Sequence, residues 1–229
     1  MKRAGPPAYE PFETLVLSLQ IKPGDTVIDL GANVGHYTTR FSSYVGSEGS
    51  VYAFEPDPTA FNALSKTVNV IPLKNVTLDN RAVANKTGKL RLYTVRNPQG
   101  DYRVFDSGDG RDSFEINAVR LDHYFKGHKG KIDFIKMDIQ GSEPGAIEGA
   151  KKILQDNPHL CLATEFCPFL LRLFGVEPLD YLRTLLDYGF LLRNIIERTK
   201  TLEPVIDIQY LVSRYDGTAG NYTNLLATR

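Results

Sequence analysis

The sequence predicts one α/β domain over residues 1–229, with a helical extension at 1–24 and a core at 25–215. Short apolar runs bounded by Gly or Pro alternate with segments of helical period, which is typical of parallel strands joined by crossover helices. Near the C-terminus, two strand-like runs are separated only by a polar turn. The sheet is therefore expected to finish with an antiparallel strand.

The elements follow in order from the periodicity of the apolar residues. Phe12, Leu15, Val16 and Leu19 recur at helical spacing, which predicts a helix over residues 9–20. Strands are expected at residues 25–31, 50–55, 75–80, 132–139, 159–166, 189–197 and 208–214, with a hairpin arm at 88–95. Helical segments follow the first, second, fourth and fifth of these strands, and the last of them is the Leu-rich segment at 178–187.

Composition and charge exclude several classes of protein. The 229 residues carry 27 basic and 27 acidic side chains, a balance that argues against nucleic acid or an anionic membrane as the main partner. Cys161 and Cys167 fit neither a disulfide framework nor a zinc motif. No run approaches the roughly 18 apolar residues of a membrane helix, and the N-terminus lacks the apolar part of a secretory signal. A cytoplasmic location is expected.

A polar, Gly-rich segment at residues 96–113 is longer than ordinary connections between elements. Such segments are lids, binding loops or solvated excursions. We take residues 96–113 as a candidate lid loop, with the solvated excursion as the alternative.

A glycine-containing turn after the first strand carries the strongest chemical signal. The run Asp29-Leu30-Gly31-Ala32-Asn33-Val34-Gly35 lies where the carboxyl edge of a doubly wound sheet binds ligands. Glu55 ends the second strand, 20 residues after Gly35, and a carboxylate so placed can accept both ribose hydroxyls of a nucleoside.

The glycine spacing distinguishes two classes of nucleoside cofactor. A dinucleotide fingerprint reads GxGxxG, whereas this turn lacks the third glycine. Asp29 would repel a pyrophosphate but suits a ligand with an ammonium and a sulfonium group. These features favour an adenosyl cofactor over a dinucleotide.

Five motifs in this order and spacing resemble the FkbM-type S-adenosylmethionine-dependent methyltransferases: VIDLGANVGHYT, AFEPDP, the run from Asp79 to Val83, IKMDIQGSEPGAIEGA and ATEF. The resemblance covers about residues 25–200. It implies a class I methyltransferase (Rossmann-like) fold with a seven-stranded sheet in the order 3-2-1-4-5-7-6, and methyl transfer to a hydroxyl oxygen. One position departs from the family pattern: Gln140 stands where an acidic residue is common, so no catalytic role is carried over to it.

The resemblance also implies roles for individual residues. Asp29, Gly31, Asn33 and Gly35 are expected on the methionine and ribose side of S-adenosylmethionine, Glu55 on the ribose hydroxyls, Asn80 near the adenine, and Asp138 beside the methyl group and the acceptor. Asn80 has an equal alternative as a simple turn residue.

Methyl transfer to oxygen needs a route for the hydroxyl proton, and the candidates are Asp138, Glu165, Glu143 and His36. Asp138 and Glu165 end adjacent strands, so their carboxylates are expected to converge. Two carboxylates also suit a divalent cation, but two ligands are few, so a metal is possible but not favoured. Glu143 has the alternative of favouring a helix N-terminus. For His36 and Lys136, structural roles are favoured.

The sequence therefore predicts an S-adenosylmethionine-dependent O-methyltransferase that acts on a small molecule or glycan and releases S-adenosylhomocysteine. The alternatives are an NAD-dependent oxidoreductase and a non-catalytic nucleoside-binding domain. Neither the acceptor nor the oligomeric state follows from the sequence.

Overall fold

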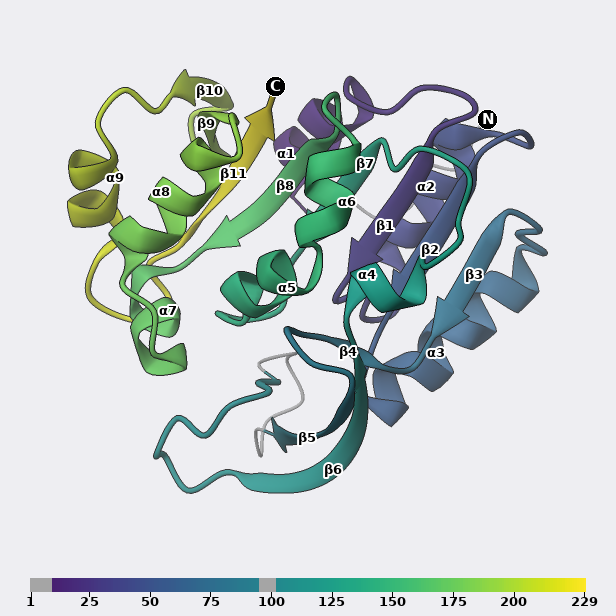
Figure 1. Cartoon of the computed structure of the whole chain (residues 1–229), viewed down its shortest axis with the longest axis horizontal. Helices are drawn as coiled ribbons and strands as arrows, with labels where there is room; N and C mark the ends of the chain where they lie inside the picture. The colour runs from purple at the N-terminus through teal and green to yellow at the C-terminus, as the bar shows by residue number, and fades with distance from the viewer. Residues whose placement is uncertain (1–9, 95–101) are drawn as a thin grey trace, which may run out of the picture.

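The computed structural model describes residues 10–94 and 102–229 and contains a central sheet of eight strands (Figure 1). The strands are β1 (Thr26–Leu30), β2 (Ser50–Phe54), β3 (Val76–Asp79), β7 (Phe134–Met137), β8 (Cys161–Phe166), β9 (Leu191–Ile196), β10 (Thr201–Pro204) and β11 (Thr223–Thr228). Their order across the sheet is β10-β9-β11-β8-β7-β1-β2-β3. β1, β2, β3, β7 and β8 are parallel, whereas β11 pairs antiparallel with both β8 and β9.

The expected seven-stranded sheet is wrong in its number of strands. β10 forms an antiparallel hairpin with β9 and adds an eighth strand at the edge. Its sequence, TLEP, is mostly exposed and contains Pro204, which suits an edge strand and gives no apolar alternation to detect.

The expected strand at residues 208–214 is also wrong, because this segment is the helix α9 (Ile208–Tyr215). The Asp207 carboxylate accepts hydrogen bonds from the backbone N–H groups of Gln209 and Tyr210 and caps the helix. The buried residues Leu211 and Val212 lie on one side of it, against the core. The antiparallel final strand is β11, which lies beyond the 25–215 range expected for the core.

Helices cover both faces of the sheet (Figure 1). One face packs against α1 (Pro11–Ser18), α2 (His36–Val45) and α3 (Pro58–Val70). The other face packs against α4 (Leu121–Tyr124), α5 (Glu143–Gly149), α6 (Lys151–Asp156), α7 (Pro168–Phe174), α8 (Pro178–Asp187) and α9. No helix within the two described ranges has the length and apolar character needed to cross a bilayer.

A small second sheet, β4-β6-β5, lies near the carboxyl end of β1 and β2 (Figure 1). It consists of β4 (Ala82–Val83), β5 (Gly88–Thr94) and β6 (Asp112–Val119). β6 includes the last two residues of the segment 96–113. Residues 96–101 lie outside the described residues, and Arg103 pairs with Tyr93 on β5. The lid assignment stays a prediction.

Candidate functional site

Polar side chains form a row across four neighbouring strands, on the face that α1 and α2 cover. Asp29 on β1 is paired in register with Lys136 on β7, and Glu165 on β8 with Asn224 on β11. Asp138 follows Lys136 by two residues and therefore lies on the same face. Farther from the carboxyl edge, the same face is apolar, with Val27, Phe134, Ala163 and Leu226 in the core. The row of polar side chains therefore marks where the apolar core ends and the candidate site begins.

A cavity of about 460 Å³ opens at this edge of the sheet. Its walls come from the row itself, from the β1–α2 turn, and from Tyr102 and Val104 beside the small sheet. Six of the nine residues expected in the site line it, namely Asp29, Gly31, Asn33, Glu55, Asp138 and Glu165. Its volume suits a small-molecule ligand.

The β1–α2 turn comes close to the end of β7. Gly31 has φ +79°, and a Cβ on it would collide with the carbonyl oxygen of Asp138. Asn33 also has positive φ, at 48°. Gly35, with φ +95°, is the N-cap residue of α2, and a Cβ there would meet Leu64 at 2.8 Å. Gly35 does not line the cavity, so its role in the structure is to let α2 approach α3.

Glu55 fixes the β1–α2 turn and also faces the cavity. Its Oε2 accepts a hydrogen bond from the backbone N–H of Asn33 at 2.8 Å, and Oε1 accepts one from the N–H of Asp57 at 2.9 Å. Burial raises the pKa of Glu55 to about 7, although these two donors act against the shift. Each carboxylate oxygen has a second lone pair, so hydroxyl groups of a ligand have acceptors here.

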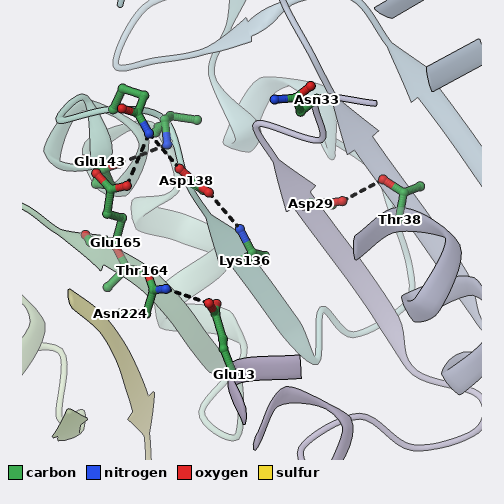
Figure 2. Close-up of polar contacts among 12 residues, drawn as sticks. Glu13, Asp29, Asn33, Thr38, Lys136, Asp138, Glu143, Thr164, Glu165 and Asn224 are labelled. Atoms are coloured by element: carbon green, nitrogen blue, oxygen red, sulfur yellow. Dashed lines mark hydrogen bonds and ion pairs between the residues drawn. The ribbon is translucent and has the colours of Figure 1, made fainter. Parts of the chain in front are cut away.

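Asp29 is almost fully buried, and one of its oxygens has no partner. Oδ2 accepts a hydrogen bond from the Thr38 hydroxyl at 2.7 Å (Figure 2). Oδ1 is buried and finds no hydrogen-bond donor among the described residues. Burial raises the pKa of Asp29, while Lys136 and Thr38 oppose that effect. A buried carboxylate oxygen without a donor is costly in an empty site and suits a cationic ligand group.

The carboxylates of Asp138 and Glu165 converge, as expected. The side-chain amide of Gln140 donates a hydrogen bond to each of them, at 3.0 Å to Asp138 and 3.2 Å to Glu165. The Lys136 ammonium lies 3.4 Å from the other oxygen of Asp138 (Figure 2). The pKa of Glu165 is raised well above its ordinary value, first by burial and then by the charges of Asp138 and Glu143.

Besides Gly35, two expected site residues lie outside the cavity. Asn80 is exposed, and the wall near it is formed by Arg81, Ala82 and Val83. Glu143 is buried behind the β7–α5 turn, where its carboxylate accepts a hydrogen bond from the N–H of Ile139 at 3.0 Å. This contact supports a structural role, since Glu143 holds the turn that carries Gln140.

Two more charged residues belong to this polar cluster: Lys136, expected from the sequence only in a structural role, and Glu13, which sequence reasoning missed. The Lys136 ammonium lies over the Tyr37 ring, 4.5 Å from its centroid, and nearby carboxylates raise its pKa although burial opposes this. Glu13 on α1 accepts a hydrogen bond from the Asn224 amide at 2.6 Å, and burial raises its pKa to about 8. The strand parity of Lys136 and Asp138 is the sequence signal for the structural role expected of Lys136 beside Asp138. Glu13 shows no such signal, because it comes to the site through the packing of α1.

No group of three or more metal-ligating side chains is found within residues 10–94 and 102–229. The two carboxylates that converge are bridged by a neutral amide instead.

Residues 29–192 match the family model of the methyltransferase FkbM domain. A probable cobalt-precorrin-6B C(15)-methyltransferase (decarboxylating) from Saccharolobus solfataricus is 29% identical over 144 residues, which are 62% of this chain and 69% of the relative.

Two solved structures share the fold. The methyltransferase FkbM from Methylobacillus flagellatus superposes with a TM-score of 0.55 at 15% identity over 90% of this chain, which spans only 43% of that protein. A putative methyltransferase from Streptococcus mutans, in complex with SAH, gives a TM-score of 0.53 at 13% identity over 94% of each chain. Since the family model spans well over half of the sequence, the chain belongs to the FkbM family of S-adenosylmethionine-dependent methyltransferases.

Proposed function

We propose that this protein transfers the methyl group of S-adenosylmethionine to a hydroxyl oxygen of a small molecule or glycan. The observation that carries the cofactor assignment is Oδ1 of Asp29, a buried oxygen at the cavity wall that accepts no hydrogen bond from the described residues. When bound, S-adenosylmethionine supplies an electrophilic methyl group on a sulfonium. Asp29 fits its ammonium, and Glu55 fits its ribose hydroxyls.

The acceptor half of the cavity then lies toward β8 and β11, where Asp138, Glu165 and Asn224 line the wall. In-line displacement needs an aligned hydroxyl and a group that takes its proton. Burial raises the pKa of Glu165 well above its ordinary value, which makes this carboxylate a better proton acceptor. Asp138, held by Lys136 and Gln140, is suited to orient the hydroxyl.

The acceptor atom is decided by experiment, since the relative from Saccharolobus solfataricus is named for methylation of carbon. Pooled hydroxylated metabolites and saccharides are incubated with the protein and S-adenosylmethionine, and release of S-adenosylhomocysteine is followed. Calorimetry with S-adenosylhomocysteine and with NAD separates the cofactor classes. Binding of NAD alone would contradict the proposal, and turnover that yields a C-methyl product would correct the acceptor atom.

Asp138→Asn tests the acceptor side once a substrate is found. We expect turnover to fall by about 100-fold while affinity for S-adenosylhomocysteine stays within a factor of about three, because the shape is kept and only the anionic oxygen is lost. Wild-type activity in the presence of a chelator is the companion measurement. Loss of activity with chelator and its return with magnesium would show that Asp138 and Glu165 hold a cation instead.

A further inference from the structure

Gln140 occupies a strained position that the surrounding structure holds in place. Its φ of 55° lies in the left-handed region, which is uncommon for a residue other than glycine. Both backbone polar groups of the neighbouring Ile139 are held: its N–H donates to Glu143, and its carbonyl accepts from the Ser142 hydroxyl at 2.7 Å. Strain of this kind persists only where other contacts enforce it, and it concentrates at functional sites.

The strained backbone directs one amide group between two carboxylates. Nε2 of Gln140 donates to Oδ1 of Asp138 and to Oε2 of Glu165, so both of its protons are used. The Gln140 side chain also lines the cavity. Two carboxylates that share one donor lie close enough to repel each other when both are ionised. The Gln140 amide is neutral and stabilises the charged form of each carboxylate.

The two carboxylates differ in how many of their oxygens accept a hydrogen bond from the described residues. Asp138 has Gln140 on Oδ1 and Lys136 on Oδ2. Glu165 is held through Oε2, and no donor from residues 10–94 or 102–229 contacts its Oε1. Glu165 lines the cavity, and among the contacts of the described residues Oε1 is the oxygen of this pair that keeps both lone pairs for a ligand hydroxyl.

We propose that Gln140 is a positioning residue that couples Asp138 to Glu165 and assigns Glu165 Oε1 to receive the proton of the acceptor hydroxyl. The inference rests on the proposed function. In the step it serves, the O–H bond breaks and its proton goes to Glu165 Oε1. The oxygen forms a bond to the methyl carbon, and the electron pair of the broken C–S bond stays on sulfur.

The charges around Glu165 define the pH dependence. Asp138 and Lys136 face it from β7, Glu143 lies behind the β7–α5 turn, and Glu10 reaches it from the segment before α1. Glu165 accepts protons only when it is ionised, so turnover should rise with pH through its pKa. The Gln140 amide lowers that pKa relative to a site without the donor, because it binds the charged form.

The test follows the carboxyl groups directly, so it needs no known acceptor. The ¹³C carboxyl signals of Asp138 and Glu165 are titrated in the presence of S-adenosylhomocysteine, with assignments from Asp138→Asn and Glu165→Gln. In Gln140→Met, which keeps the length and loses the amide, we expect the Glu165 midpoint to rise by about one pH unit. Gln140→Glu should raise it further. Gln209→Met, on the exposed side of α9, is the control and should leave it unchanged.

Gln140→Asn covers the case in which the Met variant does not fold, since Asn tolerates the left-handed backbone better but is too short to bridge both carboxylates. A rise of the Glu165 midpoint in this variant supports the proposal. Midpoints equal to wild type in every folded Gln140 variant would overturn it. If the Gln140 variants shift the Glu165 midpoint as expected but the wild-type protein transfers no methyl group, only the proposed function is contradicted.

Discussion

At the scale of single residues, the site depends on which polar side chains interrupt an otherwise apolar face. Strand parity puts Asp29, Asp138 and Glu165 on that face, and the sequence is sufficient to predict this. Parity still holds for Asp138, one residue past β7, because its N–H continues the ladder to Leu30, but it fails where no ladder continues. Asn80 and Glu143 both follow strands, but local turns direct one to solvent and the other into the core.

Asp29→Asn should weaken binding of S-adenosylhomocysteine by about 10-fold, because the amide removes the negative charge that faces the ligand ammonium. Thr38 can still donate to the new carbonyl oxygen, so the fold should be kept. Isothermal calorimetry measures the affinity. Asp187→Asn, at the exposed end of α8, is the matched control. Equal affinities for Asp29→Asn and wild type would remove Asp29 from the ligand site.

The pKa of Glu55 makes cofactor affinity depend on pH. Burial raises this pKa to about 7 in the free protein. Ribose hydroxyls that donate to the carboxylate favour its ionised form, so binding releases a proton. Affinity for S-adenosylhomocysteine should therefore rise from pH 6 and level off above about pH 7.

Calorimetry in two buffers of different ionisation enthalpy counts the proton released by Glu55. Glu55→Gln is the control, since it keeps one acceptor oxygen and cannot titrate. An affinity that falls with rising pH in wild type, or the same pH dependence in Glu55→Gln, would show that Glu55 is not the titrating group.

At the scale of elements, the site is formed where two turns meet. The β1–α2 turn reaches the end of β7 because Gly31 has no Cβ, and the N–H of Asp138 donates to the carbonyl of Leu30 at 3.1 Å. The glycine turn could be predicted from the sequence, because its motif lies at a strand end. The close approach to Asp138 could not, because it depends on the pairing of β1 with β7, which are more than 100 residues apart in the chain.

Gly31→Ala should lower the free energy of unfolding by about 3 kcal/mol. Two effects combine: the positive φ, and the collision of the new Cβ with the Asp138 carbonyl oxygen. Gly24→Ala separates them, because Gly24 has φ +90° and nothing within 4 Å of a Cβ. The control should lose only about 1 kcal/mol. Urea denaturation measures both, and equal losses would mean that the chain relaxes away from the collision.

At the scale of the whole molecule, the predictable part of the fold is its parallel half. The strands β1, β2, β7 and β8 lie within the ranges expected from their apolar runs. The antiparallel end was harder, because β11 inserts between β8 and β9 although it comes last in the chain. Its position fixes Asn224 beside Glu165 and gives α1 its contact with the site through Glu13. The side of the site proposed for the acceptor is thus assembled from the two ends of the described chain.

This assembly concentrates buried carboxyl groups and gives the whole protein a distinctive pH dependence of stability. Burial is the largest cause of the raised pKa of Glu13, Asp29, Glu55, Glu143 and Glu165. Each of these groups binds its proton more tightly in the folded than in the unfolded state. Stability is therefore fully present below the unfolded pKa and is lost as pH rises through the folded values.

The free energy of unfolding should consequently fall between pH 5 and pH 8. Glu55 alone, with its pKa raised from 4.5 to about 7, corresponds to a loss of about 3 kcal/mol across this window. Urea denaturation at pH 5.5, 7.0 and 8.5 measures the trend. Glu13→Gln keeps an acceptor for Asn224 and removes a group with a pKa of about 8, so it should flatten the decline above pH 7. Glu48→Gln, on the surface, should not. A stability that rises from pH 5.5 to 8.5 in wild type would mean that these carboxyl groups are not held protonated in the folded protein.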